Sequence, residues 1–256
     1  MDKIISDKVI ELVHEIRRNK PRTGTRKLYK ELKPKLEENN INIGRDKVHK
    51  ILKHNDLLIN PSKKYSVTTD SKHHFRKHKN QIKNLDINKP ELVFVCDITY
   101  IRVRHQFAYL FLITDLFSRK IMGWTINFTM KVKDAKKAVR MAHKNRSYKG
   151  DLFHHSDRGI QYCTPSYIEY IQKLGMKPSM TDDNHVYENA VAERVNGILK
   201  HEFGIKHNFN SLKQARSEIK FAIDTYNNER LHYSIGLNTP NVVHLNPNII
   251  KDPNAA

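Results

Sequence analysis

The chain has 256 residues, with 46 Lys and Arg against 27 Asp and Glu, which gives a formal net charge of +19 at pH 7. Such an excess attracts a polyanion, commonly nucleic acid, although ribosomal and chromatin proteins share this balance. Two cysteines without a Cys-x-x-Cys pair exclude a disulfide framework and a cysteine zinc site. No apolar run approaches the roughly 20 residues that span a bilayer, and no signal peptide is visible, so we expect no membrane association and a cytoplasmic protein.

Residues 1–59 predict three short helices. Apolar residues recur at helical spacing from residue 3, a second helix begins near Thr25, where Pro34 is expected to end or kink it, and a third begins near Arg45. A basic outer surface on three short helices is typical of a helix-turn-helix module, although a plain helical bundle with a solvated basic face has the same periodicity. We therefore expect a small all-α, helix-turn-helix-like DNA-binding segment.

Residues 60–90 form a second segment that is nearly without apolar character. The stretch SKHHFRKHKNQIK carries only positive charges, with three His and one Phe among them. A chain of this composition can follow a phosphate backbone, and a merely soluble tether is the competing interpretation. We expect a basic linker.

From residue 91 the pattern changes to strands. Three apolar, β-branched and aromatic runs predict an antiparallel meander: ELVFVCDITYIRV, FAYLFLITDLF and KIMGWTINF. A helix, a short strand that ends at Asp157, a helix, the strand MKPSM and two further helices are expected to follow. This order predicts an α/β sheet with helices on its faces.

Three carboxylates lie where such a fold can bring them together. Asp97 lies in the first strand, Asp157 closes the fourth in HHSDRG, and Glu193 lies one turn into the helix NAVAERVNGILKHE. Magnesium ions that assist phosphoryl transfer need carboxylate ligands that converge on one point. Each residue also has an ordinary structural interpretation, and Asp115 in LFLITDLFSR rivals Asp97 on local pattern. We interpret Asp115 as structural, because it ends its strand at a turn.

Longer sequence words around these carboxylates resemble the DDE transposases of bacterial insertion sequences. The words are CDITYI, HSDRGIQYCTPSY and ENAVAERVNGILKHE, and 35 residues separate Asp157 from Glu193. RTGTRKLYKEL and NIGRDKVHKILKHNDLL resemble the helical DNA-binding segment of the IS-three family, and YNNERLHYSIGLNTP resembles its closing motif. The resemblance covers nearly the whole chain, and it is to that family's second-frame, integrase-like catalytic protein.

The resemblance implies a fold, a reaction and a cofactor. The fold is an RNase H-like core of the retroviral-integrase type over residues 91–204, completed by a C-terminal helix and tail over 205–256. The reaction is cleavage of the ends of an insertion sequence and strand transfer into target DNA. Two Mg²⁺ ions, which Mn²⁺ can replace, are expected to bind Asp97, Asp157 and Glu193.

The resemblance also implies a set of residues near the DNA, namely Lys200, Arg158, His155, Asn189, Tyr187 and Arg230. Lys200 lies two turns beyond Glu193 on the same helix face. Asn189 precedes that helix, and capping it is an equally good interpretation. His155 and Arg158 flank Asp157, where they can contact phosphate or support the metal ligands.

The partners implied are double-stranded DNA, in the form of terminal repeats and target, and further copies of the chain assembled on it. A protein of the upstream reading frame, separate or fused, and association with the bacterial nucleoid are expected as well. Two other functions fit the residues less closely. An RNase H-like nuclease that cuts RNA–DNA hybrids needs no basic helical module, and a non-catalytic DNA-binding protein needs no carboxylate triad.

Overall fold

The computed structural model describes residues 3–59, 74–182 and 189–250. The chain divides into two units, one of Met1–Tyr65 with His201–Gly204 and one of Ser66–Lys200 with Ile205–Ala256. The first part of the expected basic linker, 60–73, lies outside the described residues, and residues 74–90 form neither helix nor strand. No helix in the described ranges is long and apolar enough to cross a membrane.

The N-terminal unit contains the three predicted helices, which are α1 (Lys3–Asn19), α2 (Thr25–Glu38) and α3 (Arg45–His54). Each turns an apolar stripe inward, because residues three and four apart share a helix face. Arg17 of α1 links the α1–α2 turn to the segment after α3. Its guanidinium donates to the carbonyls of Thr23 at 3.1 Å and Leu57 at 2.7 Å. Pro34 was expected either to end or to kink α2. It does not end the helix, which continues through this residue to Glu38.

The second unit is built on a mixed five-stranded sheet in the order β3-β2-β1-β4-β5. The predicted meander is confirmed, because β1–β2 and β2–β3 pair antiparallel, whereas β1–β4 and β4–β5 pair parallel. The strands are β1 (Val93–Val103), β2 (Gln106–Asp115), β3 (Ile121–Asn127), β4 (Leu152–Ser156) and β5 (Met176–Met180).

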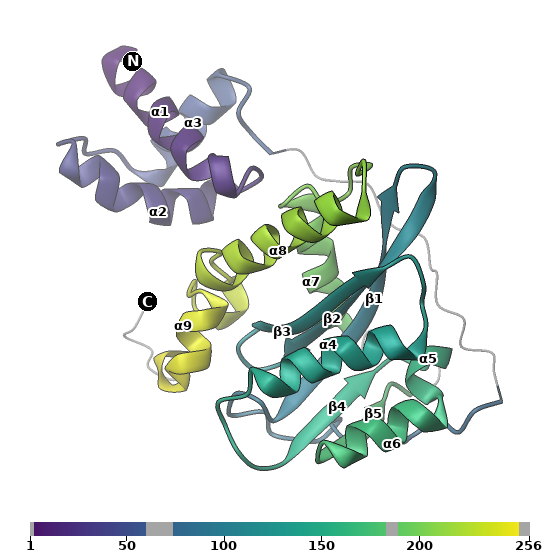
Figure 1. Cartoon of the computed structure of the whole chain (residues 1–256). Coiled ribbons are helices and arrows are strands. Elements are labelled where there is room, and N and C mark those ends of the chain that lie inside the picture. The colour runs from purple at the N-terminus through teal and green to yellow at the C-terminus, as the bar shows by residue number, and fades with distance from the viewer. Residues whose placement is uncertain (1–2, 60–73, 183–188, 251–256) are drawn as a thin grey trace. The chain divides into compact units, whose positions relative to one another are not determined.

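Helices cover both faces of this sheet, as Figure 1 shows. One face carries α4 (Val132–Lys144), α5 (Ile160–Cys163) and α6 (Pro165–Lys173). The other carries α7 (Ala190–His201) and α8 (Leu212–Asn228), and α9 (Pro240–Leu245) follows α8. Short 3-10 helices at Tyr233–Ile235 and Pro247–Ile250 complete the C-terminal part.

Gly123 sets how closely α4 approaches the sheet. A Cβ atom at this position of β3 would lie 2.3 Å from the carbonyl oxygen of Ala138 and 2.5 Å from the backbone nitrogen of Ala142. Neither atom can move without distorting the helix, so only glycine allows α4 to pack directly on β3. The neighbouring core residues of this face, including Ile113, are buried.

A buried polar cluster joins the beginning of β1, the end of β2 and α9. The carboxylate of Asp115 accepts the backbone N–H groups of Glu91 and Ser118 and the Ser118 hydroxyl, which agrees with its structural interpretation. His244 lies with Nε2 3.1 Å from Glu91 and Nδ1 3.7 Å from Asp115, and all three side chains are fully buried. Arg146 adds a second cation, 3.2 Å from Glu91.

The charges of this cluster stabilise one another. Burial opposes the ionised form of Glu91, but hydrogen bonds from His244 and from the backbone of Ser147 and Tyr148 outweigh it and lower the pKa of Glu91. Burial likewise opposes a charged His244, yet hydrogen bonds to Asp115 and Glu91 raise its pKa above the ordinary value of 6.5. The raised pKa favours the charged form of His244, which links α9 to the two carboxylates at the sheet.

We expect His244→Gln to lower the free energy of unfolding by about 3 kcal/mol at pH 6, because it leaves two buried carboxylates without this cation. A raised pKa gives stability that is complete below the unfolded-state pKa and is lost as the pH rises through the folded-state pKa. The deficit of the variant relative to the wild type should therefore shrink between pH 6 and pH 9. Urea denaturation at both pH values measures it, with His105→Gln at an exposed position as the control. A deficit independent of pH would contradict a charged His244.

Candidate active site

The parallel pairing of β1 with β4 determines where the first two carboxylates lie. Cys96 pairs with Ser156 at the last position of this ladder, so Asp97 and Asp157 follow side by side on neighbouring strands. Asp97 lies inside β1, opposite Leu112 of β2. Asp157 begins the loop after β4, where its Oδ1 accepts the N–H of Gly159 at 3.0 Å.

Helix α7 carries the third carboxylate and is attached to β1 by two asparagines. Glu193 lies in its first turn. One turn further on, Asn196 donates from Nδ2 to Oδ2 of Asp97 at 2.7 Å. Asn189, just before the helix, donates to the carbonyl oxygen of Cys96 at 3.1 Å. These bonds direct the first turn of α7 toward Asp97.

The three carboxylates act on one another electrostatically. Burial and then the charge of Asp157 raise the pKa of Asp97 to about 7, against the lowering effect of hydrogen bonds from Asn196 and the Ile98 N–H, and Glu193 raises it further. Burial and Asp157 also raise the pKa of Glu193. The three residues that the sequence analysis selected thus lie within electrostatic reach of one another, and a bound cation would relieve the repulsion that Asp157 exerts on Asp97 and Glu193.

The donor atoms suit a hard divalent ion, because all are carboxylate oxygens. The side chains are nevertheless not gathered into a cage: within the described ranges, no three Asp, Glu, His or Cys residues are close enough to hold one ion together. Asp97 is engaged with Asn196 and with the N–H of Ile98 at 2.8 Å. Residues 183–188, which lead into α7, lie outside the description.

Two of the residues expected near DNA, Lys200 and Arg158, are partly exposed. Lys200 is half-buried on α7; burial lowers its pKa, while the charge of Asp97 raises it, so its ammonium group lies within electrostatic reach of the carboxylates. Arg158 is also half-buried, and its Nε donates to the carbonyl oxygen of Thr181 at 2.7 Å. Tyr187 lies outside the described residues.

The expectation of DNA contact is corrected for three residues, because their side chains are buried. His155 is fully buried, with Nδ1 2.9 Å from the Ser179 hydroxyl. Asn189 is 3% exposed and binds β1 as described, so it neither reaches DNA nor caps α7. Arg230 is 5% exposed, and its guanidinium lies 6.0 Å from the ring centre of Tyr226. All three instead hold the unit together.

Sequence reasoning missed two residues at the site, Asn196 beside Asp97 and His154 beside Cys96. Asn196 lies three residues beyond Glu193, which places it on the same helix face, so the helical spacing alone would have selected it. His154 lies beneath β1, with Nε2 3.0 Å from the Cys96 sulfur and 2.8 Å from the Tyr167 hydroxyl. Burial lowers the pKa of His154 to about 4, so it is neutral near pH 7. No local pattern indicates this contact.

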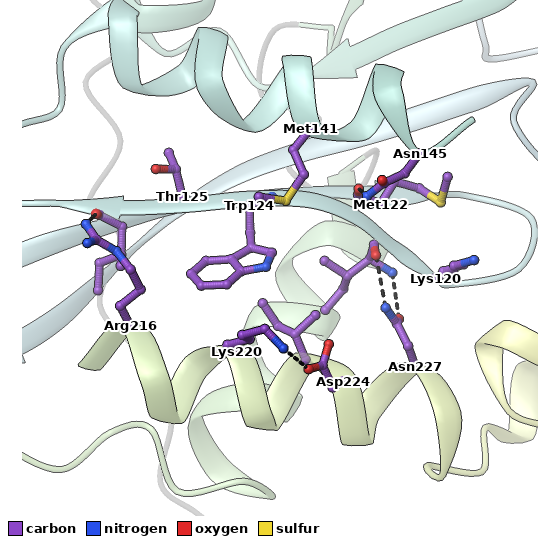
Figure 2. A pocket seen from close by; sticks show the side chains of 13 residues that line it. Lys120, Met122, Trp124, Thr125, Met141, Asn145, Arg216, Lys220, Asp224 and Asn227 are labelled. Atoms are coloured by element: carbon purple, nitrogen blue, oxygen red, sulfur yellow. Dashed lines mark hydrogen bonds and ion pairs between the residues drawn. The ribbon is translucent and has the colours of Figure 1, made fainter. Parts of the chain in front are cut away.

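A groove of about 680 Å³ lies at the far edge of the sheet, between β3, α4 and α8, and contains none of these carboxylates. Figure 2 shows it around the indole of Trp124, with Met141 on α4 and with Arg216, Lys220 and Asp224 on α8. Lys220 forms an ion pair with Asp224 at 2.7 Å. The groove is separate from the candidate active site.

Comparison with known families places this site in an integrase core. One model of the integrase core domain matches residues 87–185 and a second matches 174–240. The chain is 32% identical over 219 residues to the "Insertion element IS600 uncharacterized 31 kDa protein" of Shigella sonnei, covering 85% of this chain and 79% of that protein. It is 28% identical over 217 residues to the transposase InsF for insertion sequence IS3A of Escherichia coli K12, covering 84% and 74%.

Two further comparisons are with a relative that the chain matches over about half of its length and with a solved structure of similar fold. The chain is 32% identical over 154 residues to the putative transposase of IS986/IS6110 from Mycobacterium tuberculosis. It spans 55% of the length of that protein. A chain of the simian T-cell lymphotropic virus intasome superimposes with a TM-score of 0.54 at 15% identity, over 87% of this chain and 70% of that one. This likeness concerns the fold alone and confirms the RNase H-like α/β core. The chain belongs to the IS-three family of insertion-sequence transposases, DDE-type polynucleotidyl transferases with an integrase core.

Proposed function

We propose that this transposase cuts DNA at the ends of its insertion sequence and joins them to target DNA, with Asp97, Asp157 and Glu193 as the ligands of two divalent metal ions. The observation that carries the proposal is the electrostatic interaction of these carboxylates, which come from a strand, a strand end and a helix: Asp157 raises the pKa of both Asp97 and Glu193, and Glu193 raises that of Asp97. Mg²⁺ is the ion that an all-oxygen ligand set favours, and Mn²⁺ accepts the same ligands.

The bound ions would supply an activated water or 3′ hydroxyl and charge stabilisation at the leaving oxygen. The side chains of this protein contribute position and electrostatics. Asn196 fixes the orientation of the Asp97 carboxylate through its 2.7 Å hydrogen bond. Lys200 places a positive charge close to the carboxylates, where a phosphate of the substrate would lie. No serine or tyrosine nucleophile is required by this chemistry.

The N-terminal unit suits recognition of the element's ends. Cations occupy the exposed side of α3, opposite its buried apolar residues, and they are Arg45, Lys47, Lys50 and Lys53. A helix that turns such a row to solvent can lie along or within a DNA groove. We propose duplex DNA as the ligand of this unit, in line with the helix-turn-helix-like interpretation, and an assembly of several copies on DNA. A protein from the upstream reading frame remains a further proposed partner.

We expect Asp97→Asn, Asp157→Asn and Glu193→Gln each to abolish metal-dependent nicking and strand transfer on a labelled duplex with the element's own ends. Each change removes one metal ligand while the basic surfaces stay intact, so DNA affinity should change less than about threefold. Glu169→Gln, at an exposed carboxylate of α6, is the matched control and should keep full activity. Wild-type strand transfer by any of the three variants would refute the assignment of that ligand.

Asn196→Ala should lower strand-transfer activity by about ten- to a hundredfold, the usual effect of removing a hydrogen bond to a metal ligand. Because Asn196 positions Asp97, the Mg²⁺ concentration that gives half-maximal rate should rise as well. The measurement is a magnesium titration of the strand-transfer rate. Asn228→Ala, at an exposed residue near the end of α8, is the control. An unchanged magnesium dependence, whatever the rate, would assign Asn196 to folding alone.

A further inference from the structure

The β1–β2 hairpin extends past β4 at the end of the sheet where the carboxylates lie (Figure 1). The β1–β4 ladder stops at the pair Cys96–Ser156, whereas β1 and β2 stay paired as far as Val103 and Gln106. From Asp97 to Val103 the strand covers about 20 Å at the usual rise of a β-strand. The hairpin therefore projects well beyond the level of Asp97, where β4 no longer covers the edge of β1.

The two faces of the hairpin beyond Asp97 differ in how far the rest of the protein buries them. Thr99, Ile101 and Val103 alternate onto the same face as Asp97, and all three are buried. The backbone of Val103 also forms an isolated bridge with Phe209 at the strand edge. The opposite face carries Tyr100 and Arg102 of β1, paired across the strands with Tyr109 and Phe107 of β2. We call these four residues, Tyr100, Arg102, Phe107 and Tyr109, the hairpin ledge.

The side chains of the hairpin ledge hold one another in place. The ring of Tyr100 meets Phe107 edge to face at 5.8 Å and Tyr109 at 5.2 Å. The guanidinium of Arg102 lies 4.9 Å from the ring centre of Phe107. Phe107 is nevertheless 45% exposed, and both tyrosines are half-buried. An exposed, mutually braced aromatic group is a ready contact surface that needs little ordering on binding.

The charge around the hairpin ledge selects an anionic partner. No Asp or Glu occurs between Asp97 and Asp115, while Arg102, Arg104 and His105 are all exposed. Within the described part of the chain, neither Arg102 nor Arg104 forms an ion pair, although Arg104 donates a hydrogen bond to the carbonyl of Asn210. These cations are thus available to phosphate groups.

We propose that the hairpin ledge binds a stretch of DNA with unpaired bases, on the face of the sheet opposite the Asp97 carboxylate. Unpaired bases expose the π-faces that Phe107, Tyr100 and the Arg102 guanidinium can stack on, whereas the bases of an intact duplex do not. Arg104 and His105 at the turn would contact the phosphates. The inference rests on the proposed function for its substrate, DNA, and assigns a binding surface in addition to the metal ligands.

Fluorescence anisotropy tests this surface without chemistry, in the Glu193→Gln background. The probes are a duplex and the same duplex interrupted by a short unpaired stretch. Phe107→Ala should weaken binding of the interrupted duplex about tenfold and leave the intact duplex within about twofold, while Phe107→Tyr keeps wild-type affinity. Arg102→Ala should also reduce the slope of log affinity against log salt by about one. Phe221→Ala, at a 55% exposed position on α8, is the control.

Equal affinity of Phe107→Ala and its parent for both probes would overturn the inference, and so would an equal loss on both probes. A changed oligomeric state in sedimentation, with DNA affinity intact, would make the hairpin ledge a protein-binding surface and overturn it too. Circular dichroism and thermal melting of the variant confirm that it is folded. Absence of strand transfer by the wild-type chain, even with the upstream-frame protein added, together with the expected probe discrimination, would refute the proposed function and leave the hairpin ledge standing.

Discussion

The parallel register between β1 and β4 is the constraint on which the candidate site depends. It sets Cys96 opposite Ser156, so two carboxylates leave neighbouring strands at the same level. The strand residues under them are buried, and His154 and Tyr167 occupy the space beneath Cys96. Helix α7 can approach only because Asn189 and Asn196 supply neutral donors to β1 and to Asp97. A shift of one residue would turn Asp97 to the opposite face.

The fold treats two groups of carboxylates in opposite ways. Glu91 and Asp115 receive His244, and Glu91 receives Arg146 as well, so this cluster is neutralised from within the protein and serves to fasten α9. From the described residues, Asp97 receives a side-chain amide and a backbone N–H but no cation at ion-pair distance, and its pKa stays raised by burial and by Asp157. The first arrangement gives stability, whereas the second leaves a demand for positive charge that an external cation can meet.

Periodicity predicted the helices of the first unit, the meander and the strand before Asp157, because apolar alternation reports burial directly. The triad was selected from sequence motifs and spacing, and in the structure its members act on one another electrostatically. The burial of long polar side chains was not predictable. His155, Asn189 and Arg230 lie in polar stretches of sequence, yet tertiary packing buries all three. The Glu91–Asp115–His244 cluster could not be foreseen either, since its members are far apart in the chain. Pro34 within α2 shows that packing can override a local helix breaker.

The central claim is that Asp97, Asp157 and Glu193 form one metal centre. The most direct measurement is anomalous diffraction from crystals of the protein soaked in Mn²⁺, recorded beside crystals of Asp97→Asn. The account predicts anomalous peaks between these three carboxylates, with oxygen ligands at about 2.2 Å, and weakened or missing peaks in the variant. Ordered carboxylates without a peak between them, or manganese bound only elsewhere, would contradict it.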